Sequence, residues 1–125
     1  MFRIEKIGEQ HFYVKVLGTL PPSVAKKFIM EFNEITNELN SFSVIVDGVD
    51  LILLNLKSFQ LVLDFLKKNN ERLVRSAYII AGNPVLDKEA QILLDKAASP
   101  KRKIVNNLDD AKKWLGLNKI IIEKD

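Results

Sequence analysis

The chain contains no cysteine, which excludes disulfide bonds, thiolate metal sites and thiol nucleophiles. It has a single histidine, His11, and the sequence offers no hydroxyl or carboxylate partner that would make it a catalytic base. No apolar run approaches the roughly 20 residues that a membrane-spanning helix needs. The first residues, Met1–Lys6, carry charges where a signal peptide has an apolar core. These absences favour a cytoplasmic, non-enzymatic protein without an integral membrane segment.

The chain also lacks a strong charge of one sign. Its 19 basic and 16 acidic side chains give a formal net charge of +3, and the two signs are interspersed. Nucleic-acid-binding proteins more often concentrate lysine and arginine on one face, so we expect no nucleic-acid partner. The longest basic run, Lys101-Arg102-Lys103, is interpreted as a solvated loop before a strand rather than a phosphate-binding patch.

A glycine-rich phosphate loop is missing as well. The turn Gly82-Asn83-Pro84 lies between an expected strand and an expected helix, but it lacks the repeated glycines and the lysine of such loops. We therefore predict no cofactor. At 125 residues, 47% apolar and 28% charged, the chain has the length and composition of one globular domain, residues 1–125.

Alternating apolar and polar residues predict two strands at the start of the chain. The runs Phe2–Ile7 and Phe12–Leu17, separated by a short polar turn, are typical of an antiparallel hairpin. A helix is expected to begin at Pro22 or Ser23. Its buried stripe is predicted to comprise Val24, Phe28, Phe32, Ile35 and Leu39. The next run, Ser43–Val46, is apolar on consecutive residues, as in a central strand covered on both faces.

The second half of the chain alternates expected helices with expected strands. These elements are a helix from Leu56 to about Lys68, a strand Ala77–Ala81, a helix Asp87–Ala98, a strand Lys103–Val105 and a last helix. The first of these helices is apolar on neighbouring sides, so we expect it to be buried on more than one flank or to meet a partner. Asn107 or Asp109 caps the last helix, Gly116 ends it, and Trp114 is interpreted as core. The run Ile120–Ile122 is either a late edge strand or an apolar tail.

This order predicts an α/β fold. A hairpin followed by alternating helices and strands gives a mixed, mostly parallel sheet of about five strands with about four helices. In such sheets the loops at the carboxyl ends of the strands are where partners and ligands dock. The loop after Asp47 is therefore the first place to look for a functional site.

The segment after that strand, Val49–Leu56, is unusually apolar for a connector. Two interpretations remain open. The connector either folds beneath the next helix as additional core, or it forms an exposed apolar patch that marks a protein partner, a homodimer face or a lipid-binding mouth. Asp47 and Asp50 flank its start, but two carboxylates alone do not supply the oxygen ligands that hard cations require. We predict no metal site, and we interpret Asp47 as bonding to the turn at Gly48.

Three stretches carry a resemblance to a known family. They are Val16-Leu17-Gly18-Thr19-Leu20, Ile45-Val46-Asp47-Gly48 and the closing Leu108-Asp109-Asp110-Ala111-Lys112-Lys113-Trp114-Leu115. In this order and spacing they resemble the STAS domains of anti-sigma factor antagonists and, more closely, the SpoIIAA-like (STAS/SEC14-like) family. The resemblance covers nearly the whole chain. It implies a regulatory protein that binds a protein partner.

In STAS antagonists a kinase phosphorylates a serine or threonine that follows an aspartate at the start of the second helix. The matching positions here are Asn55 and Leu56, so the hydroxyl is missing where the resemblance implies it, and Ser58 stands where a glycine is usual. Ser58 is the one candidate phosphosite nearby. The alternative, a first-turn serine that caps the helix or faces water, is favoured.

The resemblance and the apolar connector together predict a partner-binding surface in the loop-helix region 48–66. Its expected members are Asp47, Gly48, Leu51, Leu53, Asn55, Leu56, Ser58 and Phe59. The partner is expected to be an anti-sigma-factor-like or other regulatory protein. The alternative is a SEC14-like carrier, in which the leucines and phenylalanines of the second helix line a cavity for a lipid or another apolar ligand.

Overall fold

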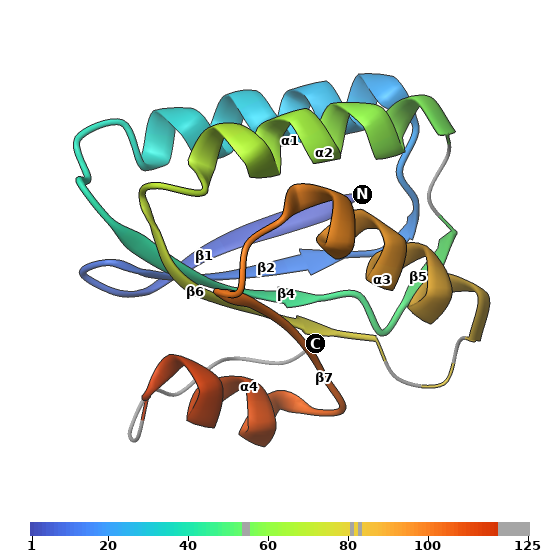
Figure 1. Ribbon diagram of the computed structural model, residues 1–125. Coiled ribbons are helices and arrows are strands. Elements are labelled where there is room, and N and C mark those ends of the chain that lie inside the picture. Colours follow the sequence, from blue (N-terminus) through green and yellow to red (C-terminus); the bar gives the residue numbers. More distant parts are fainter. Residues whose placement is uncertain (54–55, 81, 83, 118–125) are drawn as a thin grey trace.

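The computed structural model describes residues 1–53, 56–80, 82 and 84–117. It shows a sheet covered by helices on both faces (Figure 1). The elements are β1 (Phe2–Gly8), β2 (His11–Val16), β3 (Gly18–Thr19), α1 (Pro22–Ile35), β4 (Phe42–Asp47), β5 (Leu51–Leu53), α2 (Leu56–Asn69), β6 (Leu73–Ile79), α3 (Pro84–Ala97), β7 (Arg102–Val105) and α4 (Leu108–Leu115). None of the helices described here has the length and apolarity to cross a membrane.

The main sheet has five strands in the order β1-β2-β4-β6-β7. The hairpin strands β1 and β2 are antiparallel, whereas β2, β4, β6 and β7 run parallel to one another. Each parallel step is made through a helix, because the chain must return to the same end of the sheet before the next strand begins. The predicted mixed, mostly parallel α/β fold is confirmed.

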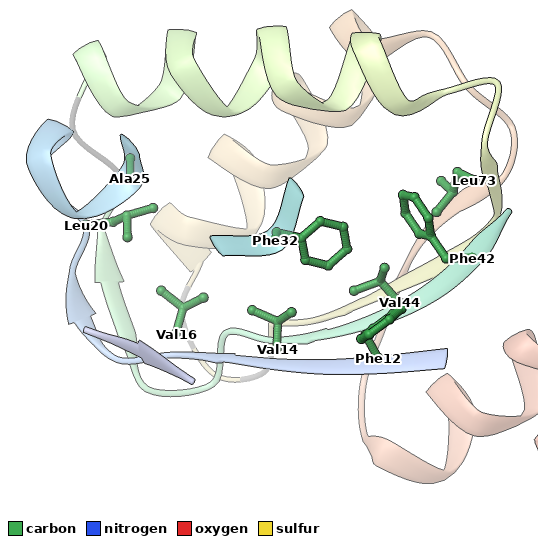
Figure 2. Close-up of a cluster of buried hydrophobic side chains, with 9 residues drawn as sticks. All are labelled: Phe12, Val14, Val16, Leu20, Ala25, Phe32, Phe42, Val44 and Leu73. Atoms are coloured by element: carbon green, nitrogen blue, oxygen red, sulfur yellow. The ribbon is translucent and has the colours of Figure 1, made fainter. Parts of the chain in front are cut away.

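Helices α1, α2 and α3 lie on one face of the sheet and α4 lies on the other (Figure 1). The core beneath α1 and α2 centres on Phe32, whose ring lies 5.3–5.7 Å from those of Phe12, Phe42 and Phe65. Figure 2 shows side chains of β2 and β4 projecting from the sheet toward Phe32. Helix α2 packs against both α1 and α3. Its burial on more than one flank therefore follows from its central place in the helical layer.

Helix α4 closes the opposite face. Its amino end is capped by Asn107, whose side chain accepts a hydrogen bond from the backbone N–H of Asp110, and its carboxyl end stops at Gly116 with φ 77°. The indole Nε1 of Trp114 donates to the Ser76 carbonyl at 2.9 Å, which ties the helix to β6. Both predicted end signals of this helix, and the packing of its tryptophan, are confirmed.

The boundaries of other elements differ from the sequence-based expectation. Helix α1 ends at Ile35 rather than Leu39, and Ile35 is exposed instead of belonging to the buried stripe. Strand β6 begins at Leu73, four positions before the apolar run at Ala77, and its pairing with β4 shifts register in this first stretch, where Val74 and Arg75 are both exposed. Neither of the short strands β3 and β5 was predicted. The expected strand or tail Ile120–Ile122 lies outside the described residues.

Candidate functional site

The connector is fixed to the sheet through its backbone. Gly48 N donates to the Ile79 carbonyl at 2.9 Å, and Gly18 N donates to the Asp50 carbonyl at 2.9 Å. Strand β5 then pairs in parallel with β3, with Gly18 opposite Leu51. A Cβ atom at Gly48 would lie 3.4 Å from the Ile79 carbonyl oxygen, an ordinary van der Waals contact, so the hydrogen bond and not the lack of a side chain fixes this position. The apolar segment therefore starts from a well-anchored turn.

The side chains of the connector divide between the core and the surface. Leu51 is half-buried and packs against the core beneath α1 and α2. By contrast, Val49 is 44%, Ile52 60% and Leu56 84% exposed. One part of the connector thus packs as core and another part is exposed, because a short strand directs alternate side chains to opposite sides. Residues 54 and 55 lie outside the described residues, as does the side chain of Leu53.

Asp47, the last residue of β4, is buried among polar partners. Its carboxylate accepts hydrogen bonds from the Tyr13 hydroxyl and from Val49 N, the latter at 3.2 Å. Lys15 Nζ lies 3.5 Å from Asp47 and 3.1 Å from Asp50. The carboxylate thus holds the turn, as predicted, although the bond goes to Val49 rather than Gly48. Within the described residues no three histidine, aspartate or glutamate side chains gather in the manner of a metal site.

The ammonium of Lys15 connects the sheet to the exposed edge of the turn. Burial by itself lowers the pKa of Lys15, but the hydrogen bond and charge of Asp50 and the charge of Asp47 outweigh it. The pKa of Lys15 is therefore raised above its ordinary value of 10.5. The lysine stays charged and locks both carboxylates in place, a structural arrangement that needs no substrate.

Ser58 is fully buried, with 0% exposure, although it lies in the first turn of α2. Its hydroxyl donates a hydrogen bond to the Leu20 carbonyl, which joins α2 to the segment leading into α1. The favoured expectation, that Ser58 caps the helix or faces water, is wrong, because the hydroxyl is buried and bonds to a distant carbonyl. A kinase would reach the hydroxyl only after the start of α2 moved away from Leu20. Phe59 beside it is half-buried and packs on the α2–α3 core.

His11 lies far from this region. It pairs with Ser43 at the start of β4, whereas the connector leaves the opposite end of that strand after Asp47. Since β2 and β4 are parallel, His11 and the connector occupy opposite ends of the sheet. The structure does not bring the histidine together with the connector.

A cavity of about 140 Å³ lies between the sheet and the helical layer. Its wall is almost wholly apolar and is built by side chains of β4, β6 and all three covering helices. The polar residues on it are Asn69, Ser76, Tyr78, Glu89 and Arg102. The SEC14-like alternative placed leucines and phenylalanines of the second helix on the wall of a cavity, and Phe65 and Leu66, together with Val62, line this one.

Arg102 is the residue that the sequence interpretation misplaced. It was expected in a solvated loop, but it begins β7 and is only 9% exposed. Its guanidinium donates to the Tyr78 hydroxyl at 2.9 Å, to the Leu66 carbonyl at 2.8 Å and to the Asn70 side chain at 3.0 Å. No local signal distinguishes it from its neighbours in a basic run, because these acceptors come from distant parts of the chain.

The arrangement of the elements matches solved structures of one fold. An uncharacterised DUF3478-family protein with a SpoIIAA-like fold from Shewanella loihica superposes with a TM-score of 0.71 at 18% identity, covering 92% of both chains. An anti-sigma factor antagonist from Mycobacterium paratuberculosis gives 0.66 at 14% identity, covering 90% of this chain and 91% of that one. The chain has a SpoIIAA-like fold. The antagonist SpoIIAA in its unphosphorylated form gives 0.60 at 12% identity, with 88% and 92% covered.

No family model matches the sequence, and no curated protein matches it either. The similarity to these three solved structures nevertheless confirms the resemblance drawn from three short stretches, at the level of the SpoIIAA/STAS fold. In this SpoIIAA-like chain, the two positions matched to the switch are Asn55, which is not described, and Leu56, an exposed apolar side chain. Leucine has no hydroxyl group, so position 56 cannot be phosphorylated.

Proposed function

We propose that this SpoIIAA-like protein is a non-catalytic, cytoplasmic regulatory module that binds a protein partner through its connector. The observation that carries the proposal is the outward display of Val49, Ile52 and Leu56 within eight residues of chain. Apolar side chains gathered in this way on a surface, with charged neighbours around them, are characteristic of interaction sites. Asp50 and Lys57 supply those exposed charged neighbours.

The structure narrows the proposed contact surface. Asp47, Gly48 and Ser58 are buried, and Leu51 and Phe59 are half-buried, so these five residues shape the surface from beneath. Leu56 is the most exposed large apolar residue described and stands at the first position of α2. Val85, 66% exposed at the start of α3, extends the apolar character because α3 contacts β5. The proposed anchors are therefore Ile52 and Leu56, with Val49 and Val85 around them.

The backbone contacts at the turn after β4 and at the start of α2 support the proposal. Backbone hydrogen bonds hold the turn after β4, and the Ser58 hydroxyl holds the start of α2. An apolar side chain presented from a fixed backbone loses little conformational entropy when a partner covers it.

The test is affinity capture from a lysate of the native host with the double substitution Ile52→Asp and Leu56→Asp. Both side chains are exposed, so the fold should remain intact, which circular dichroism would verify. The matched control is Met30→Asp with Ile35→Asp, two exposed apolar residues of α1. A specific partner should be recovered by the wild type and the control but lost from the connector variant. Equal recovery by all three proteins would remove the connector from the function.

Sedimentation equilibrium of the same proteins examines a second copy of the chain as the partner. If the wild type and control are dimeric and the connector variant is monomeric, the surface is a homodimer face. If all three have the same mass, the partner recovered from the lysate is a different protein.

A further inference from the structure

The cavity beneath the helical layer has a polar spot on an otherwise apolar wall. Ser76 on β6 is 1% exposed, and among the described residues its hydroxyl has no hydrogen-bond partner. Buried hydroxyl groups are nearly always bonded, and leaving one unsatisfied costs about 1–3 kcal/mol. An orphaned hydroxyl on the wall of a cavity is therefore available to hydrogen-bond a molecule that enters the cavity.

Two further groups lie beside Ser76. Arg102 is its partner in the β6–β7 register, and Tyr78 follows two positions along the same strand, so the three side chains share one face of the sheet. All three line the cavity. The Tyr78 oxygen accepts a hydrogen bond from Arg102, so the tyrosine's own hydrogen points away from the guanidinium. The spot thus offers hydroxyl donors, backed by a buried positive charge.

The size of the cavity selects among apolar ligands. A cavity of about 150 Å³ with an apolar wall holds one benzene molecule. At about 140 Å³, this cavity has room for a single ring and not for the chain of a membrane lipid. The long-chain form of the SEC14-like alternative is disfavoured on volume alone.

We propose that this cavity binds a small apolar molecule of single-ring size that carries one oxygen atom, with the oxygen seated on Ser76 and Tyr78. The ring would contact the apolar side chains from α1, α2 and α3, and the oxygen would satisfy the orphaned hydroxyl. Glu89 also lines the cavity, from α3, and is half-buried, so a carboxylate on the ligand would bring a second negative charge to the same cavity. A neutral hydroxyl or carbonyl oxygen therefore fits the wall better than a carboxylate.

The experiment compares phenol with toluene, two probes of the same shape that differ in the oxygen. Backbone amide shifts in ¹H–¹⁵N spectra would be followed during titration, with Ala90 as a reporter at the cavity and Ala111, on the opposite face of the sheet, as an internal control. Phenol should bind about five- to tenfold more tightly than toluene, which corresponds to one hydrogen bond. The Ala111 amide should not move.

Two variants of the intact chain separate the cavity from non-specific binding. Ala90→Leu fills the cavity, so it should weaken both probes at least about tenfold while the melting temperature stays equal or rises. Its control, Gln91→Leu on the exposed side of the same helix, should bind like the wild type. Ser76→Ala should retain toluene binding and abolish most of the preference for phenol.

Several results would overturn the proposal: no shifts with either probe, equal affinities for phenol and toluene in the wild type, unchanged binding in Ala90→Leu, or tight binding of palmitate. The proposal is independent of partner binding at the connector. None of its variants touches Ile52 or Leu56, so the two proposals can fail separately.

Discussion

Introducing a carboxylate at Ser58 tests the burial of the only nearby candidate phosphosite. The Ser58 hydroxyl is fully buried and donates to the Leu20 carbonyl. In Ser58→Asp an ionised side chain would replace the donor and face that carbonyl oxygen, and an uncompensated buried charge costs about 3–5 kcal/mol. The first turn of a helix favours an anion by about 1 kcal/mol, which offsets only part of the cost. We therefore expect a net destabilisation of about 2–4 kcal/mol.

Urea unfolding monitored by far-ultraviolet circular dichroism would measure this change. Ser58→Ala should lose only the hydrogen bond, about 1 kcal/mol. The matched control is Ser23→Asp, an exposed serine in the first turn of α1, where the same charge should shift the free energy of unfolding by less than about 0.5 kcal/mol. If Ser58→Asp is as stable as Ser23→Asp, the buried placement of Ser58 is incorrect and a phosphate is tolerated there.

Three other perturbations probe the fold. Phe32→Ala removes the ring at the centre of the aromatic cluster and should cost about 3–5 kcal/mol by urea unfolding, whereas a cost below about 1 kcal/mol would contradict its central position. Folding raises the pKa of Lys15. The stabilisation that charged Lys15 gives the fold should therefore be complete below pH 10.5 and should disappear as the pH rises through the higher folded pKa. Lys15→Met should lack this loss of stability at alkaline pH, and identical pH profiles would argue against the cluster of Lys15 with Asp47 and Asp50. Asn107→Ala should lower stability by about 1 kcal/mol, with Asn107→Asp close to wild type in thermal unfolding, and equal losses would contradict the cap.

Much of the fold was predictable because its signals are local. The alternation of Phe2–Ile7 and Phe12–Leu17 predicts the hairpin, and the run at Ser43–Val46 predicts a strand that is buried on both faces. Asn107 and Gly116 mark the ends of α4 through the capping requirements of a helix. Helix ends without such signals were less predictable, as with α1, which stops at Ile35.

The site was predictable in place but not in detail. The end of β4 and the apolar connector identified the region, because loops at the carboxyl ends of parallel strands lie outside the packed layers. The pairing of β5 with β3 then decides which connector side chains turn outward, and that pairing joins segments far apart in the sequence. Leu51 and Ile52 are neighbours of equal hydrophobicity, yet one packs inward and the other faces solvent.

The sequence by itself determined the order of the main-sheet strands and the helices, most of the apolar faces that pack them and the absence of thiol chemistry, since each depends on composition or on spacing within one element. Only the tertiary structure decided that Ser58 and Arg102 are buried and which groups accept their hydrogen bonds. The acceptor for Ser58 is Leu20, and those for Arg102 are Leu66, Asn70 and Tyr78, all contributed by other segments. The burial and hydrogen bonding of a polar side chain depend on which residues folding places against it. These residues are distant in the sequence, so the residues adjacent in the chain do not predict them.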